Sequence, residues 1–292
     1  MAGSSAAAQK GEAKRIVSSA DDGVALAAQW WLNVHEPARP RCVVVVAHGI
    51  HQSGRLYRPE AEGGCSALVD ELCAQARANV LCLDLRGWGD SGGDFRAVRD
   101  YRTTWMRDLR AVLDYAQGEF PDAPLVYFGH SIGGLIGAAL ACDAGGGPTG
   151  LAAYVLSAPT VVAPPVPGWV RWLLRHLCCC CCCLSASCCF PDMTLSEPGG
   201  CTNNATFAAA FAEESPEGQR PFPNSIGNAL AGIEIIEATK ARWQRFEKVR
   251  KPLAHTSFGG FWVSHADGCV AACARLDRAT PAGWLLLRMG RA

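Results

Sequence analysis

The sequence predicts an α/β fold in which a mostly parallel central sheet is covered by helices on both faces and interrupted by a helical lid. Short, continuously apolar runs alternate with segments in which apolar residues recur every three or four positions. Continuous apolarity is typical of strands buried on both faces, and the longer period is typical of helices that bury one side. Strands that alternate with helices form parallel sheets. The alternation stops at Pro159 and resumes near Glu247, which indicates an insertion.

The expected elements follow in chain order. Arg15 to Val17 and Val24 to Trp31 flank a turn sequence, Asp22-Gly23, and predict an antiparallel hairpin at one edge of the sheet. Amphipathic stripes predict helices over Leu68 to Ala76 and over Trp105 to Ala116. Buried strands are expected at Cys42 to Ala47, Val80 to Leu85, Leu125 to Phe128, Leu151 to Leu156, Phe258 to Val263 and Trp284 to Leu287.

Length, composition and charge exclude several classes of protein. The chain has 292 residues, of which 49% are hydrophobic, and its 27 Lys and Arg balance 27 Asp and Glu. This predicts one globular domain with an insertion, divided into a first core part (1–158), a lid (159–247) and a second core part (248–292). Without a basic block, nucleic-acid binding is not expected. The sequence shows neither a secretory signal in its first residues nor an apolar run of about 18 residues that would span a bilayer.

The sixteen cysteines are not spaced like a disulfide framework. Half of them lie in one cluster between Cys178 and Cys189, whereas others, such as Cys42, lie singly in apolar runs. We therefore expect reduced thiols and a cytoplasmic protein. Cys180 and Cys183 match C-x-x-C, but no histidine or second pair accompanies them, and no metal site is expected. Two interpretations of the cluster stay open: S-acylation, or low-complexity sequence.

The pattern G-x-S-x-G occurs twice. Gly129-His130-Ser131-Ile132-Gly133 follows the predicted strand Leu125 to Phe128 and leads into an apolar helical segment. Strand, sharp turn and helix form the context of a nucleophile elbow, which exposes the serine above the helix N-terminus. Ser131 is therefore the candidate nucleophile, with a serine in an ordinary turn as the alternative. The second copy, Gly89 to Gly93, has no helical stripe behind it, so Ser91 is expected to be structural.

Five motifs are spread along the chain: His48-Gly49-Ile50, Gly54-Arg55-Leu56-Tyr57, Asp84 to Gly92, Gly129 to Gly134, and Leu156-Ser157-Ala158-Pro159. Together they resemble the α/β-hydrolase superfamily and, within it, the monoacylglycerol lipase-like hydrolases of the serine aminopeptidase S33 type. The resemblance covers almost the whole chain. It implies the α/β-hydrolase fold with a lid after the sixth strand, and an oxyanion hole formed by the backbone N–H groups of Ile50 and Ile132.

In this fold the catalytic triad runs in the order serine, acid, histidine. Asp267 resembles the family's acid, and a helix cap is the alternative for it; Asp277 is a poorer candidate. None of the seven histidines follows Asp267, so we expect that the chain ends short of the loop that carries the base. His265 or His255 is the alternative base. Without an imidazole the Ser131 hydroxyl is a poor nucleophile, which puts the activity of this exact chain in question.

The segment from Pro167 to Leu177 carries Trp169 and Trp172 together with Arg171 and Arg175. A basic amphipathic helix of this kind is typical of a membrane interface, with tryptophan inward and arginine at the level of the headgroups. The alternative is a lid helix that packs both tryptophans against the core. In either case the lid is apolar, which favours an acyl chain over a charged peptide as the bound substrate.

These observations predict a serine hydrolase of small lipid esters, of the monoacylglycerol or lysophospholipid class, that works through an acyl-enzyme and needs no metal or organic cofactor. We expect it in the cytoplasm, with peripheral membrane contact through the lid. A catalytically inactive lipid-binding or interaction protein and a truncated gene product are the alternatives. The sequence leaves the oligomeric state open.

Overall fold

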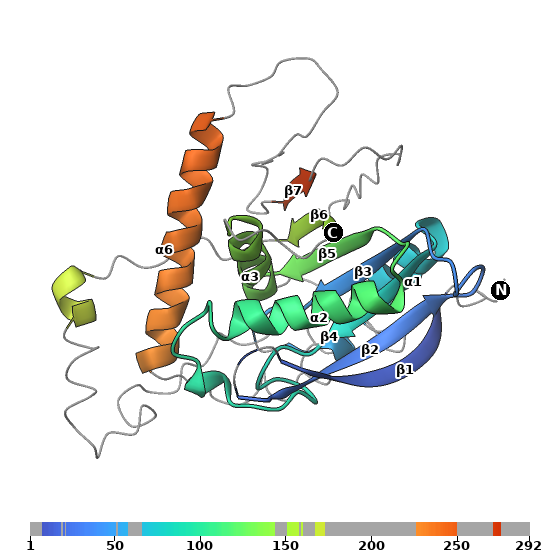
Figure 1. The fold of residues 1–292 in the computed structure, drawn as a ribbon, viewed down its shortest axis with the longest axis horizontal. Coiled ribbons are helices and arrows are strands. Elements are labelled where there is room, and N and C mark those ends of the chain that lie inside the picture. The colour runs from blue at the N-terminus through green and yellow to red at the C-terminus, as the bar shows by residue number, and fades with distance from the viewer. Residues whose placement is uncertain are drawn as a thin grey trace, which may run out of the picture.

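The strands in the described part of the chain form one seven-stranded sheet with the order β1-β2-β4-β3-β5-β6-β7 (Figure 1). The computed structural model describes residues 8–18, 20, 22–50, 52–57, 66–143, 151–157, 159, 167–172, 226–249 and 271–275. The strands are β1 (Ala8–Val17), β2 (Ala25–Asn33), β3 (Cys42–Ala47), β4 (Ala78–Leu83), β5 (Leu125–His130), β6 (Leu151–Ser157) and β7 (Ala271–Arg275). The longer helices are α1 (Ser66–Gln75), α2 (Trp105–Glu119), α3 (Ile132–Ala141) and α6 (Ile226–Val249), with 3-10 turns η1 (Gly54–Tyr57) and η2 (Phe95–Ala97). A short helix spans residues 168–172.

The strand directions confirm a parallel centre. Strands β4, β3, β5 and β6 run parallel to one another, whereas β2 pairs antiparallel with both β1 and β4. The hairpin and both amphipathic helices are confirmed, as are four of the six buried strands, although β4 lies two residues earlier than predicted. The other two predicted strands, at Phe258 to Val263 and Trp284 to Leu287, lie outside the described residues. Strand β7 was not predicted and pairs antiparallel with β6.

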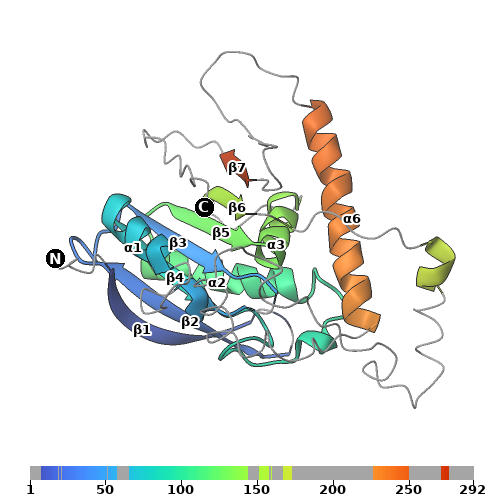
Figure 2. The same cartoon turned by 180° about the vertical axis from the view of Figure 1, so that it is seen from behind.

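Each face of the sheet packs against its own helices because neighbouring strand residues point to opposite sides. In β3, Val43 and Val45 join the core beneath α2, α3 and α6, while Val44 and Val46 join the core beneath α1. The two views show α2 and α3 on one face and α1 on the other (Figures 1 and 2). Uninterrupted valines therefore suit this strand, because both of its faces are buried.

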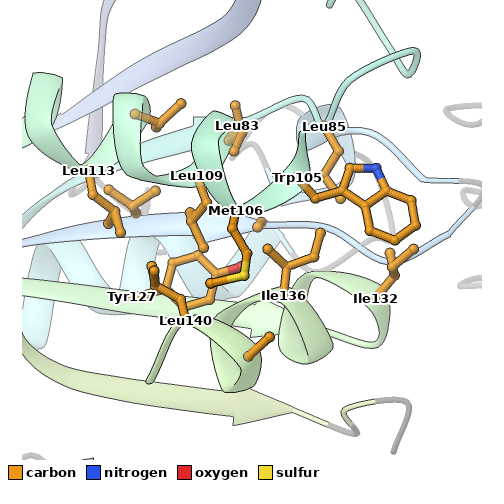
Figure 3. Close-up of a cluster of buried hydrophobic side chains, with 14 of the residues drawn as sticks. Leu83, Leu85, Trp105, Met106, Leu109, Leu113, Tyr127, Ile132, Ile136 and Leu140 are labelled. Atoms are coloured by element: carbon orange, nitrogen blue, oxygen red, sulfur yellow. The ribbon is translucent and has the colours of Figure 1, made fainter. Parts of the chain in front are cut away.

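Helix α3 lies very close to β5, and this contact supports the turn that joins them. A Cβ atom at Gly137 would lie 2.2 Å from Cε1 of Tyr127, so only glycine allows the approach. The Tyr127 hydroxyl donates a hydrogen bond to the carbonyl oxygen of Gly133 at 2.7 Å. Met106 and Leu109 of α2 fill the space above Tyr127 and α3 (Figure 3). The start of α3 is thereby held against the end of β5.

The division into two core parts and a lid, with boundaries after 158 and after 247, stays a prediction. Helix α6 lies within the predicted lid except at its last residues and packs on α3 and η2. Its residues Leu230, Ala231 and Ile235 are buried. At the other end of the contact, Nη1 of Arg242 donates to the Asp143 carboxylate just past α3, at 3.2 Å. None of the helices in the described part of the chain is both long and apolar enough to cross a membrane.

Candidate active site

Ser131 lies at the turn between β5 and α3 in a backbone conformation that L-residues rarely adopt. Its φ is 51° and its ψ is −112°. The Ser131 N–H donates to the carbonyl oxygen of Ser157 at the end of β6, and the Leu135 N–H donates to the carbonyl oxygen of Ser131, both at 2.9 Å. A strained residue persists only where its surroundings fix it. Here the neighbouring strand and the first turn of α3 do so.

The glycines on either side of Ser131 allow the turn to be this sharp. A Cβ atom at Gly129 would lie 2.6 Å from the carbonyl group of Gly133. A Cβ atom at Gly133 would lie 2.7 Å from the carbonyl oxygens of Ala47 and His48. Both distances are shorter than real Cβ atoms allow, so a side chain at either position would clash. The first turn of α3 therefore packs directly against the ends of β5 and β3. The two glycines of the motif therefore have a steric function.

The strain predicts a stability difference between two substitutions of Ser131. Alanine keeps the unfavourable φ, whereas glycine adopts it without a Cβ penalty. After allowing for the larger entropy of glycine in the unfolded chain, we expect Ser131→Gly to be more stable than Ser131→Ala by about 1 kcal/mol. Urea unfolding of the two variants measures the difference. Equal midpoints would show that the turn is not strained.

The loop after β3 lies beside Ser131. A Cβ atom at Gly49 would lie 3.2 Å from the Cβ of Ser131 and 2.9 Å from Oε1 of Gln52. The Gly49 N–H donates to that same Gln52 oxygen at 2.8 Å, which holds the loop in place. Ile50 follows Gly49 and is half-buried, and Ile132 is buried at the start of α3. The structure thus brings the segments carrying the predicted oxyanion donors next to the candidate nucleophile.

The second G-x-S-x-G motif is structural, as predicted. The Ser91 hydroxyl donates to the carbonyl oxygen of Asp84 at 2.5 Å and accepts the Ala27 N–H at 2.8 Å. The bonding role of the buried Asp84 carboxylate was not predicted: it accepts the N–H groups of Gly54 at 2.6 Å and of Asp90 at 3.0 Å. The sequence contained a signal for this, because an acidic residue at the end of a mostly apolar, buried strand needs hydrogen-bond partners.

Two histidines border this region. Nδ1 of His130 lies 3.4 Å from Oγ of Ser157, and His48 is fully buried. Burial lowers the pKa of both imidazoles below the ordinary value of 6.5, so both are neutral at pH 7. The candidate acid Asp267 and the alternative bases His265 and His255 lie outside the described residues. Their roles stay predictions.

The short helix at 168–172 exposes both of its tryptophans. Trp169 is 69% exposed and Trp172 is 60% exposed, so the interpretation that packed them against the core is wrong. Arg171 was expected at the level of the headgroups, but its guanidinium binds the Glu237 carboxylate of α6, with Nη2 2.5 Å from Oε1. Arg175 and the cysteine cluster lie outside the described residues.

Similarity to known proteins shows which family the chain belongs to. The family model described as serine aminopeptidase, S33, matches residues 38–256, which is more than half of the chain. The chain belongs to the serine aminopeptidase S33 family. The matching region contains the loop after β3, Ser131 and the whole of α6.

Curated relatives of the S33 chain include monoacylglycerol lipases. It is 35% identical over 125 residues to the monoacylglycerol lipase of Mycolicibacterium smegmatis, an alignment that covers 42% of this chain and 40% of the relative. It is 29% identical over 147 residues to the monoglyceride lipase of Mus musculus, covering 49% of this chain and 42% of the relative. The S33 chain therefore matches about two fifths of the length of these relatives.

Solved structures identify the fold of the S33 chain. A soluble variant of monoglyceride lipase from Saccharomyces cerevisiae, in complex with a substrate analog, is similar with a TM-score of 0.54 and 19% identity. That match covers 82% of this chain and 71% of the yeast protein. A lipase in its open form has a TM-score of 0.53 and 19% identity, covering 78% of this chain and 74% of that lipase. At these identities the likeness concerns the fold, which is the α/β-hydrolase fold.

Proposed function

We propose that the chain hydrolyses lipid esters of the monoacylglycerol or lysophospholipid class, with Ser131 as the nucleophile. The observation that carries the proposal is the strained position of Ser131 between β5 and α3, with Gly49 beside it. A serine in this conformation lies at a helix N-terminus, where the helix dipole favours negative charge. Acyl transfer needs such an environment, because negative charge develops on the carbonyl oxygen during the attack.

The proposed reaction has two halves. Oγ of Ser131 attacks the acyl carbonyl carbon while a general base takes the hydroxyl proton, and the N–H groups of Ile50 and Ile132 bind the oxyanion. The base then passes the proton to the departing alcohol, which leaves an acyl-serine. Water, activated by the same base, attacks the acyl-serine and releases the fatty acid. In this chain the imidazole proposed as the base is one of the two alternatives, His265 or His255, and Asp267 is proposed to orient it. The steps need no metal or organic cofactor.

Two observations support the proposed substrate class. The curated relatives are named as monoacylglycerol or monoglyceride lipases, whose substrates are esters with one acyl chain. In this chain, the exposed Trp169 and Trp172 give an apolar surface on the segment before α6. Apolar surface favours an acyl chain over a charged peptide, because burying a charge without a partner is costly.

Hydrolysis of defined esters tests the proposed function. The chain is incubated with monoacylglycerols and lysophospholipids of short and long acyl chains, and released fatty acid is quantified beside a Ser131→Ala variant. Release by the chain and its loss in the variant support the proposal. Absence of release from every ester by a chain that is folded by circular dichroism and binds fatty acid contradicts it, and favours a non-catalytic lipid-binding protein.

We also propose that residues 167–172 contact the membrane surface from the cytoplasmic side. Tryptophan partitions favourably into the interface, and burying two such side chains in lipid removes large apolar areas from water. A Trp169→Ser, Trp172→Ser double variant should therefore bind phosphatidylcholine and phosphatidylserine vesicles at least about tenfold more weakly than the parent in co-sedimentation.

The matched control for this experiment is Val17→Ser, which removes an exposed apolar side chain elsewhere on the molecule. It should bind vesicles as the parent does. The proposed contact is wrong if the tryptophan variant and the parent co-sediment equally, or if the parent stays in the supernatant.

A further inference from the structure

His48 uses both nitrogens of its buried imidazole in hydrogen bonds, one to the segment after β4 and one to its own loop after β3. It follows β3 directly, and its Nε2 accepts the N–H of Leu85, two residues past β4, at 2.9 Å. Its Nδ1 lies 2.6 Å from the carbonyl oxygen of Gly49. A backbone N–H can only donate and a carbonyl oxygen can only accept. The ring therefore carries its proton on Nδ1 and donates it to Gly49.

The Gly49 carbonyl belongs to the same peptide group as the N–H of Ile50. A trans peptide is planar, and its C=O and N–H point in opposite directions. A donor that holds the Gly49 oxygen therefore fixes the direction of the Ile50 N–H. The Gln52 N–H donates to the same oxygen at 3.3 Å, which is a longer and weaker contact than that of the imidazole. The imidazole is thus the stronger of the two constraints on this peptide.

We propose that His48 is a positioning residue that aims the Ile50 N–H at the acyl oxygen during the attack by Ser131. The proposal rests on the proposed function, because Ile50 acts as an oxyanion donor only if an acyl group reacts at Ser131. Gly49 lies against the nucleophile, since its Cβ position is 3.2 Å from the Cβ of Ser131. A donor that is already aligned before the reaction stabilises the transition state without reorganisation. His48 supplies that alignment without touching the substrate.

The surroundings of the ring keep it in the neutral form that this arrangement requires. Burial is the largest influence and lowers the pKa of His48, and the nearby His130 acts in the same direction. The Asp84 carboxylate and the bond to Gly49 oppose burial with smaller effects, and the contribution of His130 is the smallest of the four. An imidazolium would turn an N–H toward the Leu85 N–H, and the link to β4 would be lost.

Two substitutions separate the positioning role from a general loss of packing. In His48→Asn, the side-chain Nδ2 takes the place of Nδ1 and still donates to Gly49, whereas His48→Leu removes the donor. Both variants lose the acceptor for Leu85. We expect kcat for ester hydrolysis to fall at least about tenfold in His48→Leu with KM changed less than about twofold, and to recover mostly in His48→Asn. Equal losses of kcat in the two variants would overturn the proposal.

Amide hydrogen exchange gives a readout that does not depend on turnover. In both variants the Leu85 amide should exchange faster than in the parent. The Gln52 amide, which donates to the Gly49 oxygen, should exchange faster only in His48→Leu, where the peptide is free to rotate. Unchanged protection of Gln52 in His48→Leu would overturn the proposal even if hydrolysis were normal. Failure of the proposed function is recognised separately, by equal hydrolysis in the parent and Ser131→Ala.

The unsubstituted chain provides a third measurement if either variant fails to fold. Long-range ¹H–¹⁵N correlation spectra of the histidine side chains report which ring nitrogen carries the proton. His48 should be neutral at pH 7 with the proton on Nδ1. A neutral ring with its proton on Nε2 instead would exclude the hydrogen bond that aims Ile50.

Discussion

Replacing Ser131 with alanine is expected to lower kcat for ester hydrolysis by at least about 10³-fold, because the variant lacks the oxygen that forms the acyl bond. Oxyanion donors and substrate binding would still supply a small residual rate. Alanine keeps the Cβ and the backbone of the turn, so the free energy of unfolding should change by less than about 1 kcal/mol. Steady-state hydrolysis of p-nitrophenyl butyrate and thermal unfolding measure the two quantities.

The second G-x-S-x-G motif provides the matched control, because Ser91→Ala should lower the stability of the fold and leave ester hydrolysis unchanged. Without the Ser91 hydroxyl, the Ala27 N–H loses its acceptor and the Asp84 carbonyl loses a donor. Leaving such a group unsatisfied costs about 1–3 kcal/mol. Hydrolysis per folded molecule should match the parent. Equal hydrolysis by Ser131→Ala and the parent would remove Ser131 from the mechanism.

Asp108→Ala is expected to destabilise the fold by about 3–5 kcal/mol, because it leaves a buried guanidinium without its main partner. Asp108 of α2 accepts two hydrogen bonds from Arg86, from Nε at 2.8 Å and from Nη2 at 2.7 Å. The side chains of Arg86 and Asp108 are only 4% and 5% exposed. Burial acts to lower the pKa of Arg86, but the bonds to Asp108 and Asp22 outweigh it and raise the pKa. The intrinsic pKa of an arginine side chain is so far above 7 that Arg86 stays charged even when Asp108 is removed.

Asp22→Ala is the control, because Asp22 also binds Arg86 but its side chain is 47% exposed. Water screens this pair, so its loss should cost less than about 1 kcal/mol. Urea unfolding at pH 7 compares the two variants. Replacing the buried pair with apolar residues, as Arg86→Met with Asp108→Leu, should recover part of the stability lost in Asp108→Ala. If Asp108→Ala and Asp22→Ala lower the free energy of unfolding equally, an unpaired buried charge is not the cause of the loss in Asp108→Ala.

The elements that could be predicted are those with a strong local signal. Val43 to Val46 are buried on both faces of the sheet, and such burial is what an unbroken apolar run indicates. The stripe from Trp105 to Ala116 has the period of a half-buried helix and forms most of α2. The sharp turn at Ser131 was predicted because the G-x-S-x-G motif lies between such a strand and an apolar helical segment. In each case the signal lies within a few residues of the feature.

Other features had no such signal. Strand β7 has the sequence Ala-Ala-Cys-Ala-Arg, which contains neither an apolar run of large residues nor an alternation. Its pairing depends on β6, which is more than a hundred residues earlier in the chain. The exposure of Trp169 and Trp172 was equally undetermined, because an apolar helix has the same composition whether it faces the core or solvent. The ion pair of Arg171 with Glu237 became apparent only once α6 was placed beside that helix.

Local pattern alone therefore specified the α/β architecture, the position of the sharp turn at Ser131 and the structural nature of Ser91, because periodicity and turn chemistry act over short distances along the chain. The tertiary structure alone decided what His48 and Asp84 do. Their partners come from other loops, and the parallel register of β3 with β4, in which Ala47 lies opposite Leu83, brings His48 next to Leu85. A hydrogen bond depends on separations of a few tenths of an ångström. Only the packed sheet sets separations that small between residues so distant in sequence.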